Sequence, residues 1–232
     1  MIDKKWGLPA LFVVDMQNYY FKKESSFNKL SNFFSGEDSL KYISDRCQNL
    51  LIPNIKKLQT FFRKNNYPVI FLRLCGKKKD RSDLHRFFKN HNDKGEKLGL
   101  YNVYPLEDDP MSFVLDEIKP LENEIIFCKT TFSAFNSTNI NEYLKKNNIS
   151  YIFFTGIATS QCVETTARDA SDYGYSVIHI DDAQGDYYEY IHKLSLESSY
   201  SLCGGWIFNT NFVLKNFDSI IKDIYSSERN LE

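Results

Sequence analysis

The sequence predicts an α/β fold: a three-layer α-β-α sandwich around a mainly parallel, Rossmann-like sheet of six strands. Short apolar runs alternate along the chain with segments of helical periodicity. The runs are apolar at nearly every position, which is typical of strands that helices cover on both faces. Right-handed crossovers between such strands place helices on both sides of one parallel sheet.

Six segments have the length and composition of strands. They are Ala10–Val14, Pro68–Leu74, Glu124–Cys128, Tyr151–Thr155, Ser176–Ile180 and Trp206–Asn209. Helical patterns are expected over residues 39–65, 111–118, 138–147, 160–173, 187–202 and 210–226. The alternation continues along the chain, so we expect a single domain over residues 1–232.

Two long segments, residues 18–38 and 76–110, interrupt the alternation after the first and second strands. Ligands bind at the carboxyl ends of strands in such folds. We therefore expect two loop insertions near the site, and each either contributes to binding or decorates the surface.

Composition excludes several classes of partner. A net charge of −1 gives no electrostatic basis for binding nucleic acid or a membrane surface. No apolar run reaches the roughly 18 residues of a transmembrane helix, and the N-terminus lacks the apolar core of a secretory signal. Five scattered cysteines without a CxxC pair favour free thiols in a reducing compartment. We expect a cytoplasmic protein that binds a small-molecule substrate.

Three reactive side chains stand at the ends of predicted strands. Asp15 follows the first strand, Lys129 ends the third, and Cys162 lies just beyond the fourth. A parallel sheet brings all three to one edge, and together they are the components of nucleophilic acyl chemistry. Asp15 would take the thiol proton and return it to a leaving amine. Lys129 would hold Asp15 and offset developing negative charge.

Cys162 is expected in the first turn of a helix. The apolar run stops at Gly156, and a helical pattern begins near Ser160, with Thr159 or Ser160 as the expected N-cap. The helix dipole and unpaired N–H groups at this position favour the thiolate. The backbone N–H groups of Ala158 and Cys162 are expected to form an oxyanion hole.

Three stretches of the chain carry a family resemblance. They read ALFVVDMQN (residues 10–18), KTTFSAFNSTNI (129–140) and GIATSQCVETTARDA (156–170), with weaker matches at 181–183 and 192–196. The chain resembles the isochorismatase-like cysteine hydrolase superfamily, which includes nicotinamidases, N-carbamoylsarcosine amidases and ureidoacrylate amidohydrolases. The resemblance spans roughly residues 8 to 210.

The resemblance implies a catalytic triad of Asp15, Lys129 and Cys162. It also implies a cis peptide bond between Ile157 and Ala158, which would turn the Ala158 N–H into the oxyanion hole.

Further implications concern the pocket and the assembly. Gln17 would shape the pocket beside Asp15, and Phe135 would form one of its walls. Relatives are often dimers or tetramers whose neighbouring subunits close the site, so we expect a homo-oligomer.

The retained cysteine bears on the reaction. Members that cleave the enol ether of isochorismate can lack the thiol, so Cys162 favours an amide, ureido or carbamoyl substrate and a thioester intermediate. Three alternatives stay open. One is a vinyl-ether hydrolase that uses Asp15 and Lys129, another is a binding protein without catalysis, and the third is a redox sensor.

No metal and no cofactor are expected. Nicotinamidases carry an Asp-x-His pair just after the second strand, where this chain has Arg73, and Asp83, His85 and His91 come later. Arg73 is expected either to hold a substrate carboxylate or to form a structural ion pair.

Three further side chains are expected to be structural. His179 is expected to be buried, and His192 to pack or to cap a helix. Cys128 is expected in the core, on the opposite side of its strand from Lys129.

Overall fold

The computed structural model of the protein describes residues 6–203 and 205–229. These residues form a six-stranded parallel sheet with the order β3-β2-β1-β4-β5-β6. The strands are β1 (Leu8–Val14), β2 (Val69–Leu74), β3 (Ile125–Lys129), β4 (Ile149–Ile157), β5 (Ser176–Gly185) and β6 (Trp206–Phe208). The predicted α/β fold is confirmed, and the strand order is doubly wound. The predicted single domain also covers residues 1–5, 204 and 230–232, which lie outside the described residues, so its extent stays a prediction.

Helices cover both faces of the sheet. They are α1 (Asn18–Phe21), α2 (Ser26–Ser35), α3 (Lys41–Arg46), α4 (Ile52–Lys64), α5 (Arg86–Lys97), α6 (Ile140–Lys146), α7 (Glu164–Asp172), α8 (Glu189–Leu202) and α9 (Thr210–Arg229). Two π-helical turns, Cys47–Leu51 and Thr159–Val163, lead into α4 and α7. Across the described residues, none of the helices is both long and apolar enough to cross a membrane.

The helix predicted over residues 111–118 is wrong. This segment forms two short 3₁₀ turns, Pro110–Ser112 and Asp116–Ile118. Between the two turns the backbone bonds to the chain near the end of β1, since the N–H of Leu115 donates to the carbonyl of Met16 at 2.9 Å. This long-range bond interrupts the helical pattern between the two turns.

Alternate side chains of β1 enter two different apolar layers. Leu11 and Val13 pack in the cluster that includes α4 and α9, whereas Phe12 and Val14 pack in the cluster that includes α6 and α7. Both faces of β1 are thus buried, which explains why the strand is apolar at every position.

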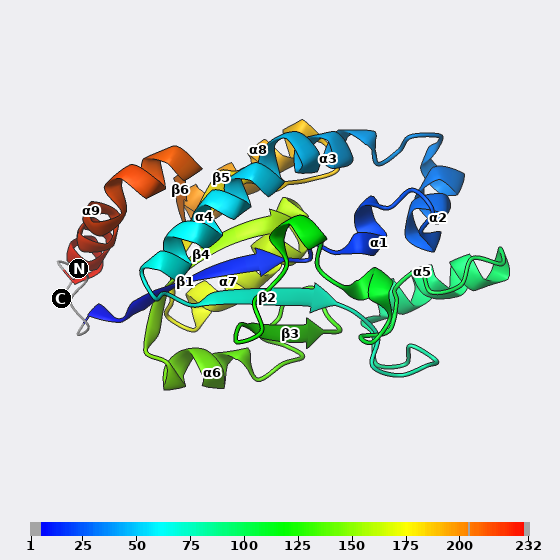
Figure 1. The fold of residues 1–232 in the computed structure, drawn as a ribbon, viewed down its shortest axis with the longest axis horizontal. Helices are drawn as coiled ribbons and strands as arrows, with labels where there is room; N and C mark the ends of the chain where they lie inside the picture. The colour runs from blue at the N-terminus through cyan, green and yellow to red at the C-terminus, as the bar shows by residue number, and fades with distance from the viewer. Residues whose placement is uncertain (1–5, 204, 230–232) are drawn as a thin grey trace.

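The two predicted loop insertions both contain helices. Residues 18–38 contain α1 and α2, and residues 76–110 contain α5. Figure 1 places these three helices beyond the carboxyl ends of β1, β2 and β3. Phe27 of α2 and Phe88 of α5 belong to the main apolar cluster. Both insertions therefore pack against the rest of the fold at the carboxyl ends of the strands, where ligands are expected.

Candidate active site

Asp15 lies where β1 ends, and the backbone turns at this residue. Its φ of 51° is in the left-handed region, which Asp adopts more readily than most other residues with a side chain. Its N–H donates to the carbonyl of Leu72 at 2.9 Å, so the turn stays attached to β2. The residue is 1 % exposed, and its carboxylate faces Lys129.

Lys129 is the last residue of β3, two strands away from β1. Neighbouring strands are about 4.8 Å apart, so the side chains of Lys129 and Asp15 together span roughly 10 Å of sheet edge. Its Nζ lies 2.8 Å from Oδ2 of Asp15, 3.1 Å from Sγ of Cys162 and 3.2 Å from the carbonyl oxygen of Thr131. The contact with Asp15 is an ion pair, and those with Cys162 and Thr131 are hydrogen bonds. The ammonium group of Lys129 thus lies between the carboxylate and the thiol.

The chain reaches Cys162 through a tight passage at the end of β4. Gly156 has a φ of 103°, and a Cβ at this position would lie 2.0 Å from the carbonyl oxygen of Val14. Only glycine therefore fits between β4 and β1. The peptide bond between Ile157 and Ala158 is cis. The π-helical turn Thr159–Val163 follows and carries Cys162.

This turn is capped by a residue distant in sequence, so the prediction of Thr159 or Ser160 as the N-cap is wrong. Ala158 occupies the cap position, with no side-chain hydrogen bond. Oδ2 of Asp186 accepts from the N–H of Ser160 at 2.6 Å, and Oδ1 accepts from the N–H of Tyr187 at 2.7 Å. Asp186 is completely buried, and both its carboxylate oxygens are used by the backbone.

The electrostatics of the site differ from the expected stabilised thiolate. Burial, and then the charge of Asp15, raise the pKa of the Cys162 thiol, although Lys129 opposes the shift. Burial also raises the pKa of Asp15, with Lys129 again acting in the opposite direction. For Lys129, burial acts against the ammonium, but Asp15 and Cys162 outweigh it and the pKa is raised. Cys162 is therefore a thiol at rest and needs a base to become a nucleophile.

The expected oxyanion donors are Ala158, which directly precedes the π-helical turn, and Cys162, which lies within it; both residues are buried. The carbonyl of Ala158 accepts from the N–H of Gln161 at 3.0 Å and from that of Val163 at 3.2 Å. The use of the two N–H groups of Ala158 and Cys162 as an oxyanion hole stays a prediction.

The side chain of Gln17 bonds to backbone groups beside Asp15. Its side-chain carbonyl accepts from the N–H of Leu74 at 2.8 Å, and its amide group donates to the carbonyls of Leu74 and Ser112 at 3.1 and 2.7 Å. All its donors are thus engaged by the protein. It holds the end of β2 beside Asp15 and has no free donor for a substrate.

Arg73 points away from Lys129. It pairs in register with Cys128, whereas Leu74 pairs with Lys129, so Arg73 and Cys128 share the opposite face of the sheet. Its guanidinium donates to Sγ of Cys128 at 3.1 Å and to Oγ of Ser112 at 3.3 Å. None of the ion pairs between described residues includes Arg73. Its expected role toward a substrate carboxylate stays a prediction. Cys128 is on the predicted face, but it is half-buried rather than in the core.

Phe135 and the histidines of the second insertion have protein partners of their own. Phe135 belongs to the same buried apolar cluster as Cys162, and its ring stacks on Tyr173, with centroids 5.1 Å apart. Its place as a wall of the substrate pocket stays a prediction. Asp83 accepts from the backbone N–H of Lys77 at 2.7 Å, and His85 caps α5. Among the described residues, no group of three His, Cys, Asp or Glu side chains is arranged to hold a metal ion.

A cavity of about 290 Å³ borders the π-helical turn Thr159–Val163. Ser160 and Gln161 form one wall, and α1, α2, α5 and the chain after β5 supply the others. Aromatic rings dominate the lining: Tyr20, Phe27, Phe87, Phe88, Tyr104, Tyr187 and Tyr188. The described lining includes no lysine or arginine, and its one carboxylate, Asp186, is used by the backbone. The described lining is therefore largely aromatic and offers no cation.

Comparison with known proteins identifies the family. The isochorismatase domain family matches residues 9–211. The chain belongs to the isochorismatase family. Ureidoacrylate amidohydrolase RutB from Yersinia enterocolitica is 26% identical over 174 residues, 75% of this chain and 74% of that protein. The isochorismatase family protein YrdC from Bacillus subtilis is 31% identical over 155 residues, 62% of this chain and 71% of that protein.

Solved structures agree with this isochorismatase fold. A cysteine hydrolase from Pseudomonas syringae pv. phaseolicola has a TM-score of 0.71 at 23% identity and covers 91% of this chain and 92% of its own. N-carbamoylsarcosine amidase from Thermoplasma acidophilum has a TM-score of 0.60 at 21% identity, over 88% and 96% of the two chains. The family resemblance predicted from the sequence motifs is thus confirmed.

Sequence reasoning missed several residues of the site. Asp186 has a positional signal, since it directly follows β5, but its contact with Ser160 spans 26 residues and has no local pattern. Tyr104 and Tyr187 had no signal beyond the high aromatic content. Both come from segments that only the folded sheet edge brings together.

Proposed function

We propose that this isochorismatase-family protein is a cysteine-dependent hydrolase of a small amide, ureido or carbamoyl compound. The observation that carries the proposal is the buried contact of Lys129 with both Asp15 and Cys162, at 2.8 and 3.1 Å. A thiol whose pKa is raised requires a base, and Asp15 is the carboxylate beside it.

The first half of the reaction forms a thioester. Asp15 takes the proton of Cys162, and Sγ attacks the carbonyl carbon of the substrate. The carbonyl oxygen becomes negative and accepts hydrogen bonds from the N–H groups of Ala158 and Cys162. Asp15 then gives its proton to the leaving nitrogen as the C–N bond breaks. Lys129 stays charged and offsets the negative charge that moves between the other two groups.

The second half releases the acyl group. Asp15, again ionised, takes a proton from a water molecule, and the hydroxide attacks the thioester carbon. The C–S bond breaks, and the proton held by Asp15 returns to Sγ. The names of the relatives support this chemistry, because ureidoacrylate amidohydrolase and N-carbamoylsarcosine amidase both denote C–N hydrolysis.

The thioester is the species to detect. Acid quenching of the enzyme with a panel of amides, ureas and carbamoyl compounds, followed by intact mass measurement, is expected to show an adduct lost in Cys162→Ala. Turnover that survives Cys162→Ala would instead support the vinyl-ether reaction of Asp15 and Lys129. Absence of both turnover and adduct across the panel would support a binding protein. The homo-oligomer, the absence of a cofactor and the cytoplasmic location remain predictions.

A further inference from the structure

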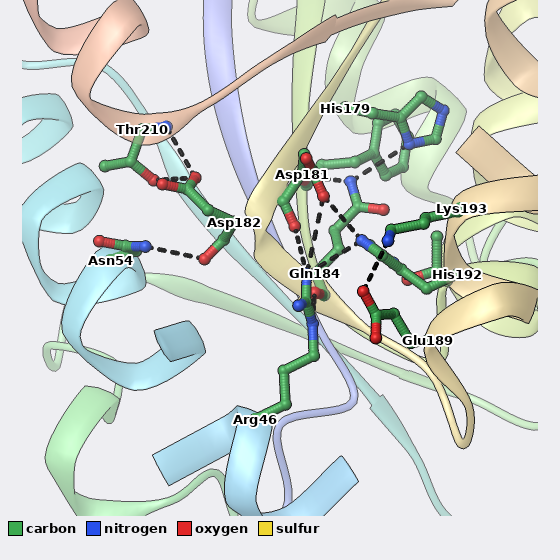
Figure 2. Close-up of polar contacts among 12 residues, drawn as sticks. Arg46, Asn54, His179, Asp181, Asp182, Gln184, Glu189, His192, Lys193 and Thr210 are labelled. Atoms are coloured by element: carbon green, nitrogen blue, oxygen red, sulfur yellow. Dashed lines mark hydrogen bonds and ion pairs between the residues drawn. The ribbon is translucent and has the colours of Figure 1, made fainter. Parts of the chain in front are cut away.

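His192 is buried between two side chains that occupy both its ring nitrogens. It lies in the first turn of α8 and is 1 % exposed. Its Nε2 is 2.7 Å from Oδ1 of Asp181, and its Nδ1 is 2.8 Å from Oγ1 of Thr159. Figure 2 shows the His192 side chain near Asp181 and the guanidinium of Arg46.

The chemistry of Asp181 fixes the direction of these bonds. A carboxylate only accepts, so Nε2 of His192 donates to Asp181, and in a singly protonated ring Nδ1 accepts from the hydroxyl of Thr159. The hydrogen bond from His192 is the main reason why the pKa of Asp181 is lowered, since it outweighs burial. Asp181 is therefore ionised at neutral pH and accepts the hydrogen bond from Nε2, which fixes the orientation of the imidazole ring.

Arg46 in turn holds Asp181. Its Nη2 donates to the carbonyl of Asp181 at 3.0 Å, and its Nε donates to the carbonyl of Gln184 at 2.9 Å. The same Nη2 forms an ion pair with Oδ1 of Asp181 at 3.6 Å. It also lies 3.0 Å from Nε2 of His192, a contact that is a hydrogen bond only when Nε2 carries no proton. Arg46 thus links α3 to Asp181 of β5, the residue that binds His192 of α8 (Figure 2).

Thr159 connects this network to the nucleophile. It is completely buried and begins the π-helical turn, directly after Ala158 and three residues before Cys162. Its hydroxyl does not cap the turn but bonds to His192 on another helix. The backbone segment that holds both candidate oxyanion donors is therefore tied to α8 by this side chain.

We propose that His192 is a positioning residue: through the hydroxyl of Thr159 it holds the turn that carries the Ala158 N–H and the sulfur of Cys162. His192 does not line the cavity, and both its nitrogens are engaged by the protein, so it takes no part in proton transfer to the substrate. For its effect on turnover this inference rests on the proposed function.

Steady-state kinetics of His192→Gln and Thr159→Val test the inference. Displacement of the turn is expected to lower kcat by about 10- to 100-fold. A smaller change is expected in KM, because Ser160 and Gln161 of the turn form only one of the cavity walls. Thr159→Ser, which keeps the hydroxyl, is expected to retain activity. The matched control is Lys193→Gln, the exposed neighbour on α8 that pairs with Glu189 on the surface.

A double variant separates positioning from general stability. His192→Gln combined with Thr159→Val is expected to be no slower than the slower single variant, because both remove the same bond. Multiplicative losses, or a normal kcat in folded His192→Gln, would overturn the inference. If His192→Gln does not fold, Thr159→Val against Thr159→Ser decides in the same way.

Alkylation of Cys162 gives a readout that needs no substrate. In a Cys128→Ser background, iodoacetamide labelling of Cys162 is expected to change at least about threefold in His192→Gln and in Thr159→Val, but not in Lys193→Gln. A change in labelling without any amide turnover would support the positioning role and count against the proposed function. Unchanged labelling in both variants would overturn the positioning role alone.

Discussion

Oδ2 of Asp15 and Nζ of Lys129 lie 2.8 Å apart, and both residues are almost completely shielded from solvent. A buried pair of this kind is strongly coupled, because either charge alone is costly to bury. Substitution of either residue is therefore expected to destabilise the buried charge of the other.

Asp15→Asn is expected to lower kcat by about 100- to 10,000-fold, since it removes the base that takes the thiol proton. It also leaves the ammonium of Lys129 without a countercharge, which is expected to cost about 3–5 kcal/mol of unfolding free energy. Turnover of purified protein and urea unfolding measure the two effects. Asp45→Asn, an exposed aspartate on α3, is the control. A rate within tenfold of the parent would remove Asp15 as the base.

Cys128, rather than Cys162, is expected to react first with iodoacetamide at pH 7. The side-chain hydrogen bond with Cys75 and then the charge of Arg73 lower the pKa of Cys128 despite its burial, whereas burial and Asp15 raise that of Cys162. Peptide mass mapping is expected to show labelling of Cys128 at least about tenfold faster. Arg73→Leu is expected to slow it. Faster labelling of Cys162 would instead support the stabilised thiolate that its position in the first helical turn predicts.

Uncharged substrates are expected to be preferred over otherwise identical carboxylates. The described cavity lining offers no cation, and an unpaired buried carboxylate is costly. Phenylurea and 4-ureidobenzoate form a matched pair, and kcat/KM is expected to favour phenylurea by at least about tenfold if both react. Leu40→Arg, which adds a cation to the lining, is expected to narrow this ratio. A preference of the parent protein for 4-ureidobenzoate would contradict the expectation that the cavity disfavours a carboxylate.

His179 is expected to make stability fall in mild acid. Burial lowers its pKa to about 4 in the folded protein, against about 6.5 when unfolded. Between these values only the unfolded chain takes up the proton, so the unfolding free energy is full above pH 6.5 and falls toward pH 4. The loss from this group is up to about 3 kcal/mol. Urea unfolding across this range measures it.

A second histidine of the chain, His85, provides the control for this pH effect. His179→Gln is expected to flatten the slope between pH 6.5 and 4, whereas His85→Gln, at an exposed histidine, is expected to keep it. An unchanged slope in His179→Gln would mean that another group causes the loss.

Chelators are expected to leave turnover unchanged. His91 of α5 lies among aromatic rings, with Phe87 5.9 Å away, and Asp83 is used by the backbone. Dialysis against EDTA followed by assay tests this expectation, with metal content measured before and after. Activity lost on dialysis and restored by zinc would contradict it.

The sheet and the convergence of three residues were predictable because both follow from local rules. Apolar runs define strands, and parallel strands share one carboxyl edge, so Asp15, Lys129 and Cys162 needed only their positions in the chain. The electrostatic state of Cys162 was not predictable in this way. Its pKa depends on burial and on the charge of Asp15, which together outweigh the opposing charge of Lys129.

Arg73 and His192 illustrate the limit of local patterns. The face on which Arg73 lies depends on the parity of its position at the strand end, and a shift of one residue reverses it. His192 stands in a sequence match, but its bond to Thr159 spans 33 residues. Side-chain partners at such separation leave no periodic signal.

The closed contact of Asp15, Lys129 and Cys162 has a consequence for charge. With Asp15 ionised and Cys162 protonated, the cluster contains one carboxylate, one ammonium and one neutral thiol, and its net charge is zero. In the proposed reaction the thiol proton moves to Asp15, and the cluster then contains a neutral acid, an ammonium and a thiolate, so the net charge is still zero. The proposed activation thus redistributes charge among buried groups and creates no isolated ion. A site of this kind is expected to keep its rate over a wide range of ionic strength, because salt screens net charge at a distance and not a shift confined to buried groups.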